Sequence, residues 1–432
     1  MTLDQNQKNR IRQGNWRAIR LLAGLTLLVL APLALGLLWV RWDYWSALRK
    51  LEQRLGPLTT EALGHAEQVP DEENAAAGLL AAGGALVLSE AEGKALSAAL
   101  QTEGFPPPEV LAPLVPLLVT NRRALALTAE ALELPGLNWG VDYSLGSKAP
   151  LPNLLPQLKL ARLIFLRGAV ATHHGDAEGL HQAAALLGRH AEALYGEGLT
   201  LFVLIGRASE RLQHRLLAAA IADPRVDDKA TLELLVTSLP AADLEQVYEH
   251  LVHHEAVFLR RMPEELAQET SEGAGRLIYR LMSRYSVSGA LRDHLRILNT
   301  YPLPWEQHLS LRYDPGDKSM LENLRHMMVP KNFWDMPSSI RVVGLERQLL
   351  NTGLQLRLRR LDGAPSYREA AERLGLSAAG SSFELITRAD GGAEFFAPEI
   401  ESYKTVFPDN PATPTLISRL RLPDGAGPNP PG

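Results

Sequence analysis

The stretch LLAGLTLLVLAPLALGLLWV, residues Leu21–Val40, holds 20 residues and no charge. A helix rises about 1.5 Å per residue, so this stretch would be about 30 Å long, which matches the hydrocarbon core of a bilayer. Pro32 lies near its middle. Proline is tolerated in a membrane helix and can kink it. We therefore predict a single N-terminal transmembrane helix over residues 21–40.

The residues that flank this stretch predict its orientation. The basic residues before it are Lys8, Arg10, Arg12, Arg17 and Arg20, and those after it are Arg41, Arg49 and Lys50. Because the positive charge is concentrated on the short N-terminal side, we expect the N-terminus to stay in the cytoplasm. Residues from about 46 onward would then lie on the periplasmic or extracytoplasmic side of the inner membrane.

Tryptophans stand at both ends of the stretch. An aromatic ring with one polar atom favours the headgroup level of a bilayer. The residues that we expect at the membrane interfaces are Trp16, Trp39, Trp42 and Trp45.

A cleaved signal peptide and a buried soluble helix are the two alternatives. A signal peptide has an apolar region of about 7–15 residues and a cleavage site with small residues. Here the apolar run is longer and ends in Trp-Val-Arg-Trp-Asp-Tyr-Trp, which offers no such site. A buried soluble helix would not need to be free of charge on every face. An uncleaved signal-anchor is therefore favoured.

Charge is distributed unevenly along the 432 residues. Residues 1–50 carry eight Lys and Arg against two Asp and Glu, which leaves 36 basic and 47 acidic residues in the remainder, a net charge of −11. Such a domain should repel nucleic acid and anionic lipid. The chain has no cysteine, which excludes disulfides, thiolate zinc sites and a cysteine nucleophile.

The rest of the chain has a mainly helical periodicity. The clearest pair is 154–172 and 177–195, joined by His173-His174-Gly175-Asp176, where Gly175 can adopt the left-handed conformation and Asp176 can cap the second helix. Helices that expose one apolar stripe must stack to bury it, so we predict an α-helical-hairpin, repeat-like domain. The other expected helices span 71–88, 90–101, 111–132, 199–222, 228–239, 241–262, 264–285, 290–298, 317–328 and 338–361.

The pattern changes after Gly363. Residues 383–388 alternate in polarity, Asp390-Gly391-Gly392 is a turn signal, and 393–396 follow, which predicts a small β-hairpin. The predicted organisation is a basic cytoplasmic tail (1–20), a transmembrane signal-anchor (21–40), a juxtamembrane helix and linker (41–70), the helical-hairpin domain (71–362), a small β segment (363–404) and a Pro/Gly-rich tail (405–432).

Several blocks resemble a family of uncharacterised, membrane-anchored helical proteins from planctomycete-like bacteria. The blocks are DEENAAAGLLAA (71–82), NRRALALTAEAL (121–132) with VDYS (141–144), LARL (160–163) and HGD (174–176). The resemblance covers roughly residues 70–260 and implies a central hairpin similar to a tetratricopeptide unit. Many members continue with Gly-x-Tyr-Pro, whereas this chain has Gly363-Ala-Pro-Ser-Tyr367. The family implies an architecture and no activity.

The strongest polar cluster is Glu249-His250-Leu251-Val252-His253-His254-Glu255. On a helix, Glu249 and His253 share a face, as do His250 and His254, and histidines at that spacing can bind a metal. A zincin motif would need glutamate directly after the first histidine, and position 251 is leucine. A solvated helix face is therefore favoured, and we predict no catalytic, cofactor or metal site.

The stretch of residues 133–153 has no helical period and carries Trp139 and Tyr143. Long ordered loops are often functional, so this is the predicted binding loop. His173-His174-Gly175-Asp176 and Asp314-Pro315-Gly316-Asp317 are interpreted as turns. Trp305, Phe333 and Trp334 are interpreted as packing residues of a proline-rich region.

These features favour a single-pass membrane protein whose extracytoplasmic helical domain is a scaffold or binds a protein partner, without cofactor or nucleic acid. An enzymatic role is less favoured. One alternative is a membrane-anchored hydrolase or metalloenzyme that uses the region of His250 and His254. The other, by analogy alone, is a component of an envelope secretion or pilus-like assembly.

Overall fold

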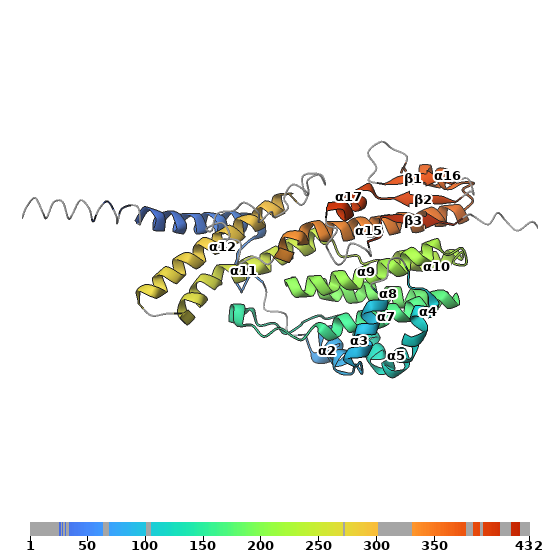
Figure 1. Cartoon of the computed structure of the whole chain (residues 1–432), viewed down its shortest axis with the longest axis horizontal. Coiled ribbons are helices and arrows are strands. Elements are labelled where there is room, and N and C mark those ends of the chain that lie inside the picture. Colours follow the sequence, from blue (N-terminus) through green and yellow to red (C-terminus); the bar gives the residue numbers. More distant parts are fainter. Residues whose placement is uncertain are drawn as a thin grey trace, which may run out of the picture. The chain divides into compact units, whose positions relative to one another are not determined.

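The computed structural model describes residues 34–63, 69–100, 105–270, 273–300, 331–376, 383–388, 392–406 and 416–423, with Thr26, Leu28 and Ala31 (Figure 1). Contacts divide the chain into an N-terminal unit (1–58, 256–296 and 315–330) and a main unit (59–255, 297–314 and 331–432). The fold is mainly α with a small antiparallel sheet, which confirms the predicted class. The boundary at residues 58 and 59 lies inside the predicted juxtamembrane segment.

Helices make up most of the main unit. Those before the sheet are η1 (Asp71–Glu73), α2 (Ala75–Gly84), α3 (Glu90–Leu100), α4 (Pro108–Leu111), η2 (Ala112–Leu114), α5 (Val115–Thr120), α6 (Arg122–Ala131), η3 (Tyr143–Lys148), α7 (Leu155–His174), α8 (Ala177–Tyr195), α9 (Thr200–Ala222), α10 (Lys229–Thr237), α15 (Lys331–Leu361) and α16 (Tyr367–Arg373). α17 (Pro398–Val406) follows the second strand.

Local capping explains where these helices begin and end. Gly175 has a φ of 69° at the end of α7, and the Asp176 carboxylate accepts from the Gly179 N–H at 3.0 Å, as predicted for this turn. A helix was expected from residue 71, but Asp71 lies in η1 and the α-helix begins at Ala75. The cap of α2 is Asn74, whose side chain accepts from the Ala76 N–H at 3.1 Å. Asn74 also binds both the N–H and the carbonyl of Asn138.

The core of the main unit forms where α7, α8 and α9 pack together, and α15 packs on α9 (Figure 1). Gly168 on α7 permits this close approach, because a Cβ there would lie 2.6 Å from a Leu216 methyl and 2.7 Å from the Ala183 methyl. The largest buried side chains around it include Phe165 and Phe395. This cluster extends from α3 to the sheet, so the C-terminal strands belong to the same hydrophobic core.

The C-terminal sheet has three antiparallel strands in the order β1 (Glu384–Thr387), β2 (Ala393–Phe396) and β3 (Arg419–Leu422). Leu420 and Leu422 face the core, and Arg419 and Arg421 are exposed. The predicted hairpin is β1 with β2. The prediction missed β3, which lies in the segment predicted as a Pro/Gly-rich tail. A four-residue strand so far along the chain is stabilised by its pairing with β2 and its packing, which local composition does not encode.

The N-terminal unit combines a helix described over residues 34–55 with residues 256–270 of α11 (Leu244–Thr270) and 274–296 of α12 (Ala274–Thr300). Asp43 is buried, accepts from the Ser288 hydroxyl at 2.8 Å and forms an ion pair with Arg292. The Tyr44 hydroxyl donates to the Arg260 carbonyl at 2.7 Å. Buried polar contacts of this kind fix one face of the 34–55 helix inside the unit.

Prolines inside helices account for two further differences from prediction. Helices were expected over 241–262 and 264–285, but α11 continues through Pro263. Pro263 has no N–H for the Leu259 carbonyl four residues earlier, and the Tyr44 hydroxyl donates to the adjacent carbonyl, that of Arg260. α15 likewise begins at Lys331 and contains Pro337, whereas its predicted start was residue 338.

Half of the predicted membrane span lies outside the described residues, as does Trp16. Within the described part of the chain, no single helix has both the length and the hydropathy needed to cross a bilayer. One helix pair, Pro108–Thr120 with Arg122–Ala131, meets that test only when combined, and it is bent by 72°. Leu111, Leu114 and Leu117 of this pair are buried in the core of the main unit.

Candidate functional site

The structure brings together the two regions that the sequence singled out separately. The Tyr143 ring at the start of η3 lies 5.1 Å, centre to centre, from the His254 ring on α11. The His254 ring lies 4.4 Å from the ring of His250, one turn earlier. The predicted binding loop and the histidine cluster therefore form one site in the main unit, which we call the Tyr143–His254 site.

Two aromatic anchors hold the loop in place. Trp139 is buried, donates from Nε1 to the Ala193 carbonyl at 3.1 Å, and meets the Phe202 ring edge to face at 5.1 Å. The Tyr143 hydroxyl donates to the Glu197 carboxylate. Both rings therefore face inward, and a partner would meet the exposed residues between and after them, among which is Leu145.

Gly198 allows the close approach of the loop before α9 to α11. Its φ is +70°, and a Cβ built there would lie 2.6 Å from Nδ1 of His254. Beside it, the Thr200 hydroxyl donates to the Glu255 carboxylate. A glycine is required at residue 198 both by the left-handed backbone and by the lack of space.

Burial controls the charge of this site. Burial lowers the pKa of His254 to about 4, and burial together with the charge of His253 lowers the pKa of His250. Burial also raises the pKa of Glu255 and of Glu197. The site therefore favours neutral side chains.

Metal binding is not favoured by this arrangement. Nδ1 of His254 lies 2.9 Å from the His250 carbonyl, so that nitrogen is occupied by the backbone of its own helix. Over the described residues, no group of three or more His, Asp or Glu side chains has a geometry that could hold a metal ion. The sequence predicted a solvated face for this helix. That prediction is wrong for His254, which is 2% exposed.

The pH dependence of stability should reveal this buried histidine. The folded state holds the His254 pKa near 4, below the usual 6.5, so the unfolded chain binds more protons between these values. His254 therefore lowers stability as pH falls from about 6.5 to about 4. We expect His254→Gln to reduce the slope of unfolding free energy against pH by up to about 1.4 kcal/mol per pH unit in that range.

The measurement is hydrogen exchange of the main-unit amides in the full chain at several pH values, with the opening free energy corrected for the pH dependence of the intrinsic exchange rate. Glu197 and Glu255 have raised pKa values and act in the opposite sense, so only the difference between the variant and the unchanged chain isolates His254. Equal slopes for the two proteins would contradict a neutral, buried His254.

A second polar cluster is buried in the main unit. The sequence analysis did not predict it. His214 on α9 lies 3.3 Å from the Glu210 carboxylate and 3.4 Å from the Glu346 carboxylate of α15. Nε of Arg347 donates to Glu210 at 2.7 Å, and the Tyr195 hydroxyl donates to the other oxygen at 2.7 Å. We call these five residues the Glu210 network.

In the Glu210 network, the ion pairs oppose the effect of burial on the pKa values of the charged groups. Burial alone would raise the pKa of Glu210, but His214 and Arg347 lower it to about 2. Burial would lower the pKa of His214, but Glu210 and Glu346 raise it. The spacing of Glu210 and His214 was a visible signal on one helix face, whereas Glu346 and Arg347 lie more than 130 residues away.

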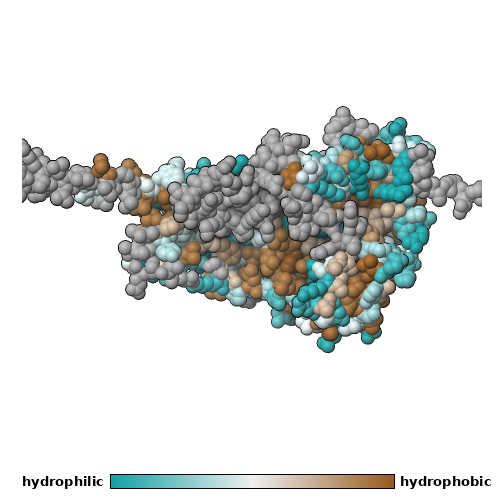
Figure 2. Space-filling model, in the orientation of Figure 1, coloured by the Kyte–Doolittle hydropathy of each residue, from teal (hydrophilic) through white to brown (hydrophobic). Residues whose placement is uncertain are grey.

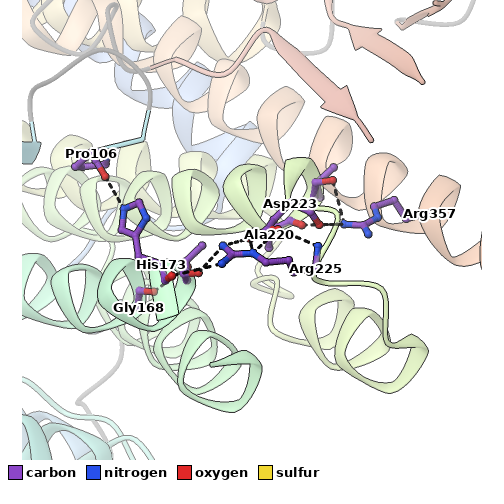
Figure 3. Close-up of polar contacts among 9 residues, drawn as sticks. Pro106, Gly168, His173, Ala220, Asp223, Arg225 and Arg357 are labelled. Atoms are coloured by element: carbon purple, nitrogen blue, oxygen red, sulfur yellow. Dashed lines mark hydrogen bonds and ion pairs between the residues drawn. The ribbon is translucent and has the colours of Figure 1, made fainter. Parts of the chain in front are cut away.

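The predicted turn after α7 is confirmed, and its residues make contacts that hold helices together. His173 contacts the Pro106 carbonyl at 2.8 Å, and the Arg225 side chain donates to the Thr172 carbonyl at 3.2 Å (Figure 3). Arg357 donates to three carbonyls at the end of α9: those of Ala220, Ile221 and Asp223 (Figure 3). Arginines at helix C-termini satisfy the last carbonyls, so these contacts join α7, α9 and α15.

The remaining sequence candidates are described only in part. Trp305, Asp314 and Asp317 lie outside the described residues, and the side chains of Phe333 and Trp334 are not described. Glu249 and His253 lie on the helix of His254, and the His253 ring lies 6.3 Å from the His254 ring. The chain matches no family model, no curated protein and no solved structure.

Proposed function

We propose that this chain is a single-pass inner-membrane protein whose extracytoplasmic main unit is a helical scaffold or protein-binding module. One observation carries the proposal: the helix of residues 34–55 has two apolar faces, and in the described part of the chain one is buried and the other is largely exposed, although the Trp39 ring lies 6.2 Å from that of Tyr285. Tyr44, Leu48 and Leu51 are buried. The opposite face exposes Leu35, Leu38, Trp39, Trp42 and Trp45, which are 66, 63, 50, 66 and 43% exposed.

An uncovered row of tryptophan and leucine is unusual on a soluble protein and marks an interaction surface. This row begins inside the charge-free stretch of residues 21–40 and extends just past its end, and Figure 2 shows hydrophobic residues on this part of the chain. Tryptophan favours the membrane interface. The uncovered row is therefore best accounted for by lipid headgroups, with the basic tail on the cytoplasmic side.

The binding role rests on the architecture of the main unit. α7, α8 and α9 are consecutive helices that pack side by side, as helical-hairpin repeats do (Figure 1). Such stacks expose extended surfaces that bind other proteins. A tetratricopeptide-like arrangement of these hairpins belongs to the proposal.

Membrane attachment is tested on the full chain. We expect it to stay with the membrane pellet after an alkaline carbonate wash. A phosphatase fused to its C-terminus should be active outside the cytoplasm, and the same enzyme fused to its N-terminus should be inactive. Recovery of the full chain in the soluble fraction would contradict the proposal.

The tryptophan face has its own readout in vesicles with brominated lipid tails, which quench nearby tryptophan fluorescence. We expect the triple variant Trp39→Phe, Trp42→Phe, Trp45→Phe to lose most of the quenching. The matched control is Trp139→Phe, which removes a tryptophan buried in the main unit and should leave the quenching unchanged. Equal quenching in all three proteins would mean that this face does not contact lipid.

A further inference from the structure

A cavity of about 520 Å³ lies along β3 in the main unit. Its floor is the small-residue face of α9 at Ala218, Ala219 and Ala222. Residues 416–421 line it consecutively. Because side chains alternate between the two faces of a strand, a cavity on one face would touch only every second residue. Contact with Arg419, Leu420 and Arg421 in a row, together with residues 416–418 just before the strand, shows that the cavity follows the edge of β3.

The hydrogen-bond pattern identifies which backbone groups face this edge. The Ala397 N–H donates to the Ser418 carbonyl at 2.9 Å, which marks these two residues as a hydrogen-bonded pair. Such pairs alternate along an antiparallel ladder, so Leu420 and Leu422 also bond to β2. The N–H and carbonyl groups of Arg419 and Arg421 therefore point away from β2, and among the described strands none pairs with β3 on that side.

The charge at this edge is mainly positive. Arg215, Lys404, Arg419 and Arg421 line the cavity, with Glu401 as the one acidic lining residue. Arg419 already forms ion pairs with Glu394 at 2.8 Å and with Glu401 at 3.7 Å, so a peptide carboxylate there competes with these two glutamates. Arg215 is buried, and burial together with the neighbouring Arg211 lowers its pKa to about 10. A negative charge in the cavity would stabilise these cations. This positive field is local, because the chain as a whole has a net charge of −5.

An exposed strand edge with two arginines selects its partner. Basic residues on an edge strand prevent pairing with neutral or basic strands of other chains. A strand with acidic side chains is attracted by the same charges, so the edge discriminates between partners. Addition of a strand to a sheet edge is an established way to bind an extended peptide, with backbone hydrogen bonds for affinity and side-chain pockets for specificity.

We propose that the edge of β3 binds an extended peptide segment with acidic side chains at alternate positions. The segment adds to the sheet as a fourth strand. Its acidic side chains lie on the outer face beside Arg419 and Arg421, and its other side chains face the alanines of α9. This inference rests on the proposed binding role and names the chemistry of the partner.

The test is fluorescence anisotropy of the full chain in detergent with a short, labelled peptide that alternates glutamate and valine. We expect saturable binding that weakens as salt is added. The same peptide with lysine in place of glutamate should bind at least about tenfold more weakly, as should the peptide to a chain with Arg419→Glu and Arg421→Glu.

A pair of substitutions at one residue separates backbone pairing from charge. Arg421→Gln removes the charge alone and should weaken binding of the peptide, whereas Arg421→Pro also removes an N–H that points away from β2, so it should abolish the extra strand while leaving the ladder with β2 in place. The matched control is Thr387→Pro on the outer edge of β1. The Arg388 N–H donates to the Gly392 carbonyl at 2.8 Å, so the Thr387 N–H also points outward by the same alternation. The control should bind the peptide as the unchanged chain does.

Two N-methylated peptides complete the test, one methylated on the glutamates and one on the valines. Strand addition requires that one of the two loses binding and the other keeps it. Equal binding of both, or displacement by free glutamate or inorganic phosphate, would mean that the cavity takes a small anion and would overturn the proposal. Binding of the lysine peptide equal to that of the glutamate peptide would also overturn it.

The two proposals fail independently. A chain that binds the glutamate peptide but leaves the membrane on alkaline washing contradicts membrane anchoring alone. A chain that stays in the membrane but does not distinguish the peptides contradicts the inference about β3 alone.

Discussion

Replacement of Arg347 by methionine is expected to destabilise the main unit by about 3–5 kcal/mol. Arg347 donates to the Glu210 carboxylate from α15 and also to the Ala242 carbonyl. Glu210 has no exposed surface. Without the guanidinium, its negative charge stays buried with a weaker set of partners, which is the costly way to break a buried ion pair.

The matched control is Arg373→Met. Arg373 forms an ion pair with Glu369 at 2.6 Å, but both side chains are more than 40% exposed. Exposed pairs of this kind contribute about 0.3–0.5 kcal/mol. A double variant, Arg347→Met with Glu210→Gln, should recover part of the lost stability because the uncompensated charge is gone.

The chain has two units, so its overall unfolding is not expected to be two-state. Hydrogen exchange of the α9 amides in the full chain reports the opening free energy of the main unit directly. A loss for Arg347→Met no larger than that for Arg373→Met would mean that the Glu210 network does not stabilise the contact between α9 and α15.

Gly198→Ala is expected to cost about 2–5 kcal/mol, the sum of two effects. A left-handed backbone costs a residue with a Cβ about 1–2 kcal/mol, and overpacking costs about 1–3 kcal/mol. The new methyl group would press on the His254 ring, so the Tyr143–His254 site should be disturbed first.

Gly175 provides the control for Gly198. Its φ of +69° is nearly the same, but a Cβ there would have nothing within 4 Å. Gly175→Ala therefore carries the backbone cost alone, about 1–2 kcal/mol. Hydrogen exchange of the α9 amides in the full chain gives the stabilities, and near-ultraviolet circular dichroism follows the packing of Trp139 and Tyr143. Equal losses of unfolding free energy in the two variants would contradict the prediction, because they would mean that the His254 ring moves away from the methyl group without destabilising the protein.

Local signals predicted the helices well where capping residues are unambiguous. α8 was expected over 177–195 and spans Ala177–Tyr195, because Gly175 and Asp176 specify the turn before it. The prediction was wrong at Pro263 and Pro337, since proline usually ends a helix and here both helices continue through it. The strand β3 was missed for a related reason, because its pairing partner lies across α17 and a further segment of chain.

In the candidate site, too, local sequence predicted the individual residues, but it did not predict the contact between them. Trp139 and Tyr143 stood out in a loop without helical period, and His250 and His254 stood out on one helix face. Their meeting could not be predicted, because more than 100 residues separate them and the contact requires the glycine at residue 198. The Glu210 network depends in the same way on contacts between α9 and α15.

The N-terminal unit has a consequence for the order of events during synthesis. Asp43 leaves the ribosome 245 residues before Ser288, its hydrogen-bond partner. At about 5–20 residues per second, the delay is on the order of ten seconds or more. Throughout that interval Tyr44, Leu48 and Leu51 lack the α11 and α12 segments that complete their unit, while the intervening chain of the main unit is being made. The nascent protein must therefore keep this helix from aggregating until its last partners arrive.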